Sequence, residues 1–245
     1  IRAVIAQRNY KSAEEIVEIE KACDVTADMH ITAMKVLRPG MYEYEVVAEM
    51  NRVAESNNCE LSFATIATIN GQTLHNHYHG NKVKPGDLFL IDAGAEVESG
   101  YAGDMSSTIP ADKKFTTRQR EVYEIQNAMH LESVKALRPG IPYMDVYEFG
   151  LMKGNTEDAV REGAHALFYP HGLGHMMGLD VHDMENLGEI WVGYNGQPKS
   201  TQFGRKSQRL AIPLEPGFVH TVEPGIYFIP ELIDMWRAEK KFTNF

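Results

Sequence analysis

The hexapeptide KVLRPG at residues 35–40 recurs as KALRPG at residues 135–140, with identity at five of six positions. Each copy ends a long segment of helical periodicity and precedes a shorter acidic and aliphatic segment. Pro-Gly is a helix stop, and two chance stops are the alternative explanation. Because the identity extends upstream of the stop, we interpret the chain as an internal duplication with halves at roughly residues 12–112 and 113–245.

Both halves are expected to begin with a capped helix. The pairs Ser12 with Glu15 and Thr116 with Gln119 have the spacing of a capping box, in which each side chain accepts a hydrogen bond from the other residue's backbone. Apolar runs rich in Thr, Ile and Leu then indicate strands. This order predicts an α+β fold in which helices cover one curved antiparallel sheet and the halves are related by a pseudo-two-fold. The expected helices span residues 12–37, 43–56 and 116–137, and the expected strands span residues 61–69, 88–92 and 100–108.

The composition indicates a globular protein with a small or peptide partner. The chain of 245 residues is 43% hydrophobic with a formal net charge of -10, and it lacks the basic patch of a nucleic-acid or anionic-membrane surface. No apolar run approaches the roughly 20 residues that cross a bilayer. Cys23 and Cys59 are expected to be reduced thiols, which favours a cytoplasmic location. The first residue is Ile1, so we expect the chain to begin inside a longer polypeptide. Whether it forms a homo-oligomer stays open.

Two aspartates are expected to face each other on neighbouring strands. Asp92 ends an apolar run within IDAG, and Asp104 lies on the returning strand within YAGD. Opposed side chains of an antiparallel pair lie about 5 Å apart, and two carboxylates at that distance repel unless a cation lies between them. A buried carboxylate without a partner is unfavourable by several kcal/mol, so Asp92 needs a metal or an arginine partner. Two turn-capping aspartates are the alternative.

The densest histidine segment is HGLGHMMGLDVHD at residues 171–183, in which His171, His175 and His182 stand among glycines. Neutral imidazole binds divalent ions and polarises carbonyl groups. Farther along, Glu223 ends another apolar strand within TVEPG, in a setting similar to that of the first aspartate. Oxygen ligands with an imidazole and no thiolate favour Mn, Co, Fe or Zn, and suggest a hydrolytic two-metal centre.

These motifs resemble those of a known family over nearly all of the chain. HGLGHMMGLDVHD and TVEPGIY at residues 221–227 are similar to segments of the pita-bread metallopeptidases, and within that family to aminopeptidase P and prolidase rather than methionine aminopeptidase. IDAGAEVESGYAGDMSST at residues 91–108 is similar to bacterial aminopeptidase P. The resemblance implies the pita-bread fold and an Xaa-Pro aminopeptidase, a hydrolase that releases the N-terminal residue from peptides with proline in second position. The alternatives are a prolidase acting on Xaa-Pro dipeptides and a non-catalytic, peptide-binding member of the fold.

The resemblance also implies two divalent ions, usually manganese in this branch, bridged by a water or hydroxide that attacks the scissile carbonyl. Asp92 would bind one ion, Asp104 would bridge both, and His175 and Glu223 would hold the other. Glu223 would also take the proton of the attacking water, a role that needs a carboxylate within hydrogen-bond reach.

Further histidines match positions of the family that contact substrate. His75 and His182 would polarise the scissile carbonyl and stabilise the oxyanion, with His77 and His79 as alternatives to His75. His171 would line the proline pocket, and loop packing is its alternative role.

The chain departs from the family pattern at its ends. The last ligand of the family is a second bridging glutamate, which we expect beyond Phe245 because Glu231 and Glu239 stand in the wrong local sequence. Relatives also carry a separate domain before the helix that begins at Ser12. We therefore expect this stretch alone to hold metal weakly and to be inactive.

Overall fold

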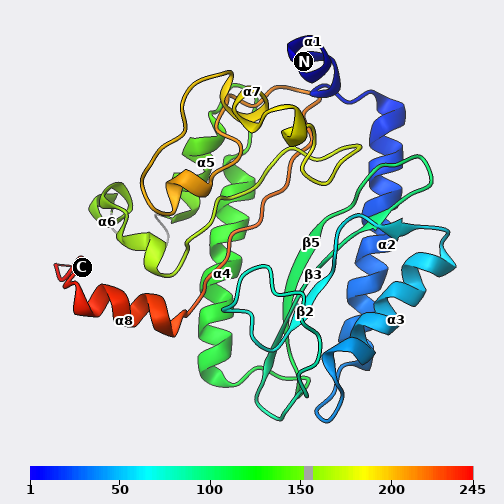
Figure 1. Ribbon diagram of the computed structural model, residues 1–245, viewed down its shortest axis with the longest axis vertical. Helices are drawn as coiled ribbons and strands as arrows, with labels where there is room; N and C mark the ends of the chain where they lie inside the picture. Colours follow the sequence, from blue (N-terminus) through cyan, green and yellow to red (C-terminus); the bar gives the residue numbers. More distant parts are fainter. Residues whose placement is uncertain (152–156, 245) are drawn as a thin grey trace. The chain divides into compact units, whose positions relative to one another are not determined.

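The computed structural model divides into two compact units, which we name the sheet unit and the helical unit after their main elements. It describes all residues except 152–156 and 245. Figure 1 follows the chain through both units in sequence colours. The sheet unit comprises Lys11–Gln119 and Met177–Asp183, and the helical unit comprises Ile1–Tyr10, Arg120–Met176 and Met184–Phe245.

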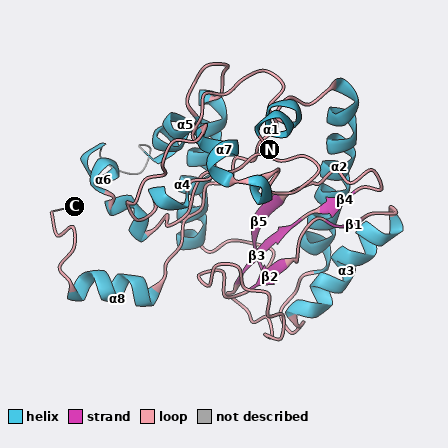
Figure 2. Ribbon diagram, turned by 45° about the horizontal axis from the view of Figure 1, so that its top comes forward, coloured by secondary structure: helices cyan, strands magenta, loops and turns pink. Residues whose placement is uncertain are grey.

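The sheet unit combines a three-stranded antiparallel sheet, in the order β2-β3-β5, with a two-stranded sheet formed by β1 and β4. Helices α2 and α3 lie side by side and pack on the three-stranded sheet through a shared apolar core (Figure 2). The elements are α2 (Ala13–Val36), α3 (Glu43–Ser56), β1 (Glu60–Leu61), β2 (Ile66–Thr68), β3 (Leu88–Ala93), β4 (Ala95–Glu96) and β5 (Met105–Pro110).

The side chains of strand β3 alternate between the apolar core and the opposite face of the sheet. Its burial alternates along the strand, so that Phe89 and Ile91 lie fully buried in the same core as Met29 of α2 and Val46 of α3. Successive side chains of a strand point to opposite faces. Asp92 is therefore directed away from the apolar core, which allows a carboxylate to stand within an otherwise apolar run.

The predicted helices are confirmed to within a residue at each end, because their capping signals form. The Ser12 hydroxyl accepts a hydrogen bond from the Glu15 backbone N–H (3.3 Å), and the Glu15 carboxylate accepts one from the Ser12 N–H (2.7 Å). Thr116 and Gln119 make the same reciprocal pair at the start of α4 (Thr117–Ala136). A capping box satisfies two donors that the first helical turn would otherwise leave without partners.

Two predicted strands are shorter than expected. The strand expected over residues 61–69 is split into β1 and β2, and the strand expected over residues 100–108 starts only at Met105. The Ser62 hydroxyl donates to the Gly103 carbonyl (2.7 Å), so a side-chain hydrogen bond replaces ladder bonds at both interruptions. A Cβ at Gly103 would also lie 2.4 Å from Thr26 Oγ1, so the backbone here passes against α2 before it joins the sheet.

The helical unit is built around an apolar core that includes Tyr143, Tyr147 and Leu173. Among the residues that the structure describes, it contains no strand, and no helix of either unit has the length and apolar content needed to cross a membrane. Its elements are α1 (Arg2–Arg8), most of α4, α5 (Tyr143–Leu151), α6 (Glu157–Glu162), α7 (Glu189–Tyr194), α8 (Pro230–Ala238) and short 3-10 helices at Ala164–Leu167, Glu185–Leu187 and Arg205–Ser207.

The repeated hexapeptide forms the same turn in both units. Arg38 donates through its guanidinium Nη1 to the Val36 carbonyl (3.2 Å), and Arg138 donates in the same way to the Ala136 carbonyl (3.2 Å). In each case the arginine satisfies a carbonyl at the end of a long helix, where backbone acceptors lack partners within the helix.

The glycines of the two copies also have equivalent conformations and partners. Gly40 has φ +97° and Gly140 has φ +84°, a region that L side chains rarely adopt. The Gly40 N–H donates to the Val83 carbonyl (2.8 Å), and the Gly140 N–H donates to the Leu214 carbonyl (2.7 Å). The two turns thus bind a distant segment of their own unit by the same backbone bond.

His165 is expected to make the helical unit sensitive to acid. Its side chain is buried, and the Tyr147 hydroxyl lies 3.0 Å from its Nε2 atom. Burial and the neighbouring Arg205 lower the pKa of His165 from 6.5 to about 4. Between these two values the unfolded chain binds a proton that the folded chain does not, so the free energy of unfolding falls as the pH decreases through this window.

At about pH 4.5 the loss should amount to about 2 kcal/mol relative to neutral pH. Urea unfolding of the full-length protein at both pH values measures it. The variant His165→Gln keeps a polar group near Tyr147 but does not titrate, so it should lose about 2 kcal/mol less than the parent over the same interval. Equal losses in the two proteins would show that His165 is not the responsible group.

Candidate active site

The segment that carries His175 runs antiparallel to the segment that carries Glu223 within the helical unit. The Thr221 N–H donates to the His175 carbonyl (2.9 Å), and the Glu223 N–H donates to the Leu173 carbonyl (2.8 Å). A Cβ at Gly174 would lie 2.4 Å from the Thr221 carbonyl oxygen, so only glycine allows the two backbones to approach this closely. Local backbone pairing therefore fixes the two predicted ligands relative to each other.

The continuous strand predicted to end at Glu223 is not formed. Only an isolated bridge between Met176 and His220 is present at this point of the described chain. Pro224 follows Glu223 directly and has no N–H, so it cannot extend the ladder. The segment is extended and hydrogen-bonded, but too few consecutive bonds form to make a strand.

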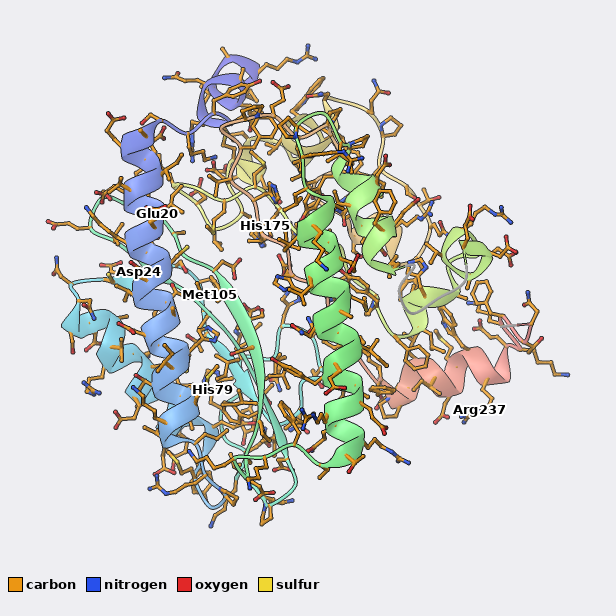
Figure 3. All side chains as sticks on the ribbon, turned by 180° about the vertical axis from the view of Figure 1, so that it is seen from behind. Glu20, Asp24, His79, Met105, His175 and Arg237 are labelled. Carbon is orange, nitrogen blue, oxygen red and sulfur yellow. The ribbon has the colours of Figure 1, made fainter. Side chains whose placement is uncertain are left out.

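The imidazole of His175 is buried, and both of its nitrogens have defined neighbours (Figure 3 labels this residue). Nδ1 lies 2.9 Å from the Met176 carbonyl, which can only accept, so Nδ1 carries the proton. Nε2 then presents a lone pair, and it lies 3.2 Å from Glu223 Oε1. The Thr221 hydroxyl donates to the same carboxylate oxygen (2.8 Å).

The facing atoms of His175 and Glu223 fit a bound cation. A lone pair of neutral imidazole and a carboxylate oxygen are both acceptors, and two acceptors at this distance repel unless a proton or a metal ion lies between them. A backbone carbonyl that holds the distal N–H of a histidine is the usual support of a metal-binding imidazole. The donor set of one nitrogen and one oxygen suits a catalytic divalent ion.

The protonation state of Glu223 is set by opposing effects. Burial alone would raise the pKa of its carboxyl group, but a proton held between Glu223 and His175 Nε2 in the absence of a metal ion, with contributions from His171 and Thr221, outweighs burial and lowers the pKa. Glu223 is therefore a carboxylate at neutral pH. In that form it can bind a cation and can also accept a proton.

The two aspartates of the sheet unit lie on one strand pair but are not opposed. Asp92 in β3 is paired with Ser106 of β5, and Asp104 comes directly before Met105, the first residue of β5, which Figure 3 labels. Asp104 is thus two positions from the partner of Asp92, and such diagonal neighbours lie about 7–8 Å apart by their backbones. The predicted direct opposition is corrected to a diagonal one. The two residues still belong to the same face, since they are offset by an even number.

His30 supports this end of the sheet from the core side. Its Nδ1 lies 2.7 Å from the Ser107 hydroxyl and its Nε2 lies 3.3 Å from the Ala93 carbonyl. Burial lowers the pKa of His30, which favours the neutral ring. In the sequence His30 is one member of an apolar helical stripe, and nothing local indicates that its ring bonds to both strands.

The three histidines between β2 and β3 have different surroundings. His75 and His77 are exposed, and His75 has a positive φ of 54°. The ring of His79, labelled in Figure 3, is half-buried, and its Nε2 lies 3.1 Å from the Thr65 carbonyl. Thr65 directly precedes the residue that pairs with Asp92. His79 is therefore bound beside the residue that pairs with Asp92, and the role of His75 stays a prediction.

Glu43 binds both ends of the loop that carries these histidines, a role that no local pattern around Glu43 indicates. Its carboxylate is fully buried and accepts hydrogen bonds from the Thr68 hydroxyl (2.9 Å) and the Ile69 N–H (2.8 Å) at the start of the loop. At the other end it accepts from the backbone N–H (3.1 Å) and the side-chain amide (2.9 Å) of Asn81. One side chain thus closes a loop of more than ten residues.

His182 belongs to the sheet unit, although His175 belongs to the helical unit. The chain passes from one unit to the other at Met177 and returns after Asp183. Within the sheet unit the Ala102 N–H donates to the Gly178 carbonyl (2.9 Å). The second half of the histidine motif is therefore bound to the unit that carries both aspartates.

His171 lies among aromatic rings in the helical unit. Its ring meets those of Tyr169 and Tyr227 edge-on, at centroid distances of 4.8 and 5.2 Å. Nδ1 lies 2.8 Å from the Gly172 carbonyl. These contacts fit a residue that lines an apolar subsite and equally fit loop packing, so both predicted roles stand.

Glu231 and Glu239, which are not expected to be metal ligands, lie in α8 and directly after it. Glu231 is exposed in the first helical turn, and Glu239 pairs with Lys241 at the surface (2.7 Å). Both have the surroundings of surface charges.

The fold and the site define the class of this protein. The chain belongs to metallopeptidase family M24, whose model matches residues 17–242. Its similar relatives include the Xaa-Pro aminopeptidase of Escherichia coli (strain K12), 37% identical over 241 residues, which cover 91% of this chain and 50% of that protein. They also include the Xaa-Pro dipeptidase of Homo sapiens, 30% identical over 262 residues, which cover 99% and 52%. The chain spans about half the length of these relatives.

Solved structures agree with this assignment. A variant of Escherichia coli aminopeptidase P in complex with substrate matches with a TM-score of 0.78 and 37% identity, covering 92% of this chain and 50% of that chain. Proline aminopeptidase P II from Yersinia pestis matches with a TM-score of 0.79 and 36% identity, covering 91% and 50%. The predicted α+β, pita-bread fold class is confirmed by these matches.

Proposed function

We propose that the protein containing this chain is a metal-dependent Xaa-Pro aminopeptidase, which hydrolyses the N-terminal residue from peptides with proline in second position. The observation that carries the proposal is the pair of His175 Nε2, on a buried ring, and Glu223 Oε1, on a partly buried carboxylate, two acceptor atoms 3.2 Å apart that a cation fits. The aminopeptidase relatives in the same family support the choice of substrate.

The proposed cofactor is a pair of divalent ions, with manganese as first choice and cobalt, iron or zinc as alternatives. Asp92 and Asp104 would hold one ion, and Asp104, His175 and Glu223 would hold the other. When bound, the ions lower the pKa of a water molecule and polarise the scissile carbonyl.

The remaining chemistry is assigned to side chains. Glu223, kept as a carboxylate by its neighbours, takes the proton of the attacking water and can return it to the leaving amine. His75 and His182 donate hydrogen bonds to the carbonyl oxygen as negative charge develops on it. Those bonds strengthen in the transition state, which is the condition for catalysis.

Preference for proline is assigned to the aromatic surroundings of His171. The rings of Tyr169, His171 and Tyr227 meet edge-on, and we infer that their carbon faces form the surface against which the proline ring packs. A proline ring is apolar and its nitrogen carries no N–H in a peptide, so such a surface accepts it without leaving a donor unsatisfied.

A prolidase is the second candidate, because a dipeptidase relative covers nearly the whole chain. Assays of the full-length protein with manganese separate the candidates. We expect cleavage of a tripeptide or longer Xaa-Pro peptide, at least about tenfold slower cleavage of the Xaa-Pro dipeptide, and at least about 100-fold slower cleavage of the matching Xaa-Ala peptide. A chelator should abolish the activity and added manganese should restore it.

The reverse order of rates for the dipeptide and the longer peptide would favour the prolidase. Failure of the metal-loaded protein to cleave any of the peptides would favour a non-catalytic, peptide-binding member of the family. The cytoplasmic location and the question of a homo-oligomer stay as predictions from the sequence.

A further inference from the structure

Lys11 and Asp183 form a buried ion pair within the sheet unit. Lys11 Nζ lies 2.8 Å from Asp183 Oδ2, and each side chain is only 1% exposed. The two residues are 172 positions apart in sequence. Removing two charges from water is unfavourable, so a pair of this kind stabilises a fold little compared with an apolar pair of the same size. Its presence suggests that it selects one arrangement of the segments that it joins.

The segment that the pair fixes is Met177–Asp183, which carries His182. It is held near its start by the hydrogen bond from the Ala102 N–H to the Gly178 carbonyl, and at its end by Lys11. Asp183 is the residue directly after His182. The position of the His182 backbone is therefore determined from both sides.

Gly178 shows that the space around the pair is filled. A Cβ at this position would lie 2.7 Å from Asp183 Oδ2 and 3.0 Å from Lys11 Cε. Any side chain at residue 178 would therefore displace the pair or the backbone. Gly178, Lys11 and Asp183 are therefore packed directly against one another.

We propose that Lys11 and Asp183 are positioning residues for His182. The proposal rests on the proposed function, in which His182 polarises the scissile carbonyl. The ion pair holds the His182 segment against the rest of the sheet unit, which carries Asp92 and Asp104. The hydrogen bond from Ala102 joins this segment to the chain two residues before Asp104. Neither positioning residue needs to touch substrate or metal.

The test measures kcat of the full-length, manganese-loaded protein for an Xaa-Pro peptide. Lys11→Met and Asp183→Asn are made singly in the parent and in a His182→Ala background. In the parent each should lower kcat about 10- to 100-fold, because a catalytic group displaced by about an ångström loses that much. In the His182→Ala background the same changes should lower kcat less than about threefold, because the group they position is already absent.

Manganese content gives an independent readout, since none of the proposed metal ligands is changed. It should stay the same in all variants. The surface change Lys21→Met is the matched control, because Lys21 pairs with Glu18 at the surface of α2 with a side chain 58% exposed. It should leave kcat unchanged. Gly178→Ala keeps both charges and should reproduce the loss of kcat in the parent, which covers the case in which a charge-removing variant fails to fold.

Equal losses of kcat in both backgrounds, unchanged kcat after Gly178→Ala or Asp183→Asn, or loss of manganese in proportion to activity would each overturn the proposal. Failure of the proposed function gives a different result. In that case the parent does not cleave the peptide, or His182→Ala is as active as the parent.

Discussion

Replacement of Glu223 by glutamine is expected to lower kcat by about 10³-fold or more and to reduce the amount of bound metal. The amide keeps the size of the carboxylate and can still accept from the Thr221 hydroxyl, which lies 2.8 Å from Oε1. It lacks the negative charge that faces His175 Nε2 at 3.2 Å. A neutral amide neither attracts a divalent ion to this position nor takes a proton from water.

The measurement combines steady-state kinetics of the full-length protein with its manganese content. Glu231→Gln is the matched control, because it makes the same chemical change at an exposed carboxylate in the first turn of α8. The control should have the kcat and the metal content of the parent. A Glu223→Gln protein that retains parental kcat would show that Glu223 takes no part in the mechanism. An equal loss of kcat in Glu231→Gln would show that the effect comes from the change in net charge of the protein and not from the position of Glu223.

Replacement of Glu43 by alanine is expected to lower the free energy of unfolding by about 3 kcal/mol or more. The carboxylate accepts four hydrogen bonds at the two ends of the histidine loop, and the change leaves buried donors without an acceptor. The Thr68 hydroxyl and the Ile69 N–H are the most affected, because Thr68 is itself fully buried. The loop that carries His75 should also lose its fixed position, which lowers kcat/KM.

Urea unfolding of the full-length protein measures the stability change. Glu45→Ala is the matched control, because Glu45 lies two residues away in α3, is exposed, and accepts a hydrogen bond from the Tyr42 N–H (2.6 Å) in a capping arrangement. Its loss should lower the free energy of unfolding by about 1 kcal/mol. If both variants lost the same free energy of unfolding, the buried hydrogen bonds of Glu43 would contribute no more to stability than an exposed helix cap does.

Elements set by neighbouring residues could be predicted from the sequence. The capping pairs Ser12 with Glu15 and Thr116 with Gln119 act over three positions, and both form. The two helix stops contain Gly40 and Gly140, where the backbone has a positive φ that glycine adopts readily and other residues rarely adopt.

Features set by distant residues could not be predicted in the same way. The Lys11–Asp183 pair and the closure of the histidine loop by Glu43 join segments whose proximity is a result of folding. The diagonal relation of the two aspartates depends on strand register, and a shift of two residues leaves the alternation of side chains unchanged. Local sequence patterns therefore predicted helix starts and stops, whereas contacts between distant segments became visible only in the folded chain.

The two copies of the repeated turn differ at the third residue after their glycine. Residues 43 and 143 are equivalent in the two copies of the turn, and both side chains are fully buried. Glu43 closes the histidine loop, whereas the Tyr143 hydroxyl donates to the Thr221 carbonyl beside the Glu223 segment. The same place in each half thus supports a different segment of the proposed site.

The crossing of the chain between units at Met177 and back after Asp183 limits how the two halves can be separated. A fragment cut after Gln119 would contain the strands of the sheet unit but not the aspartate that neutralises Lys11. It would leave a buried ammonium group without a counter-charge, an unfavourable state. The first half of the chain therefore does not contain every residue of the sheet unit, and we expect residues 1–119 expressed alone to be less stable than the same residues in the whole chain.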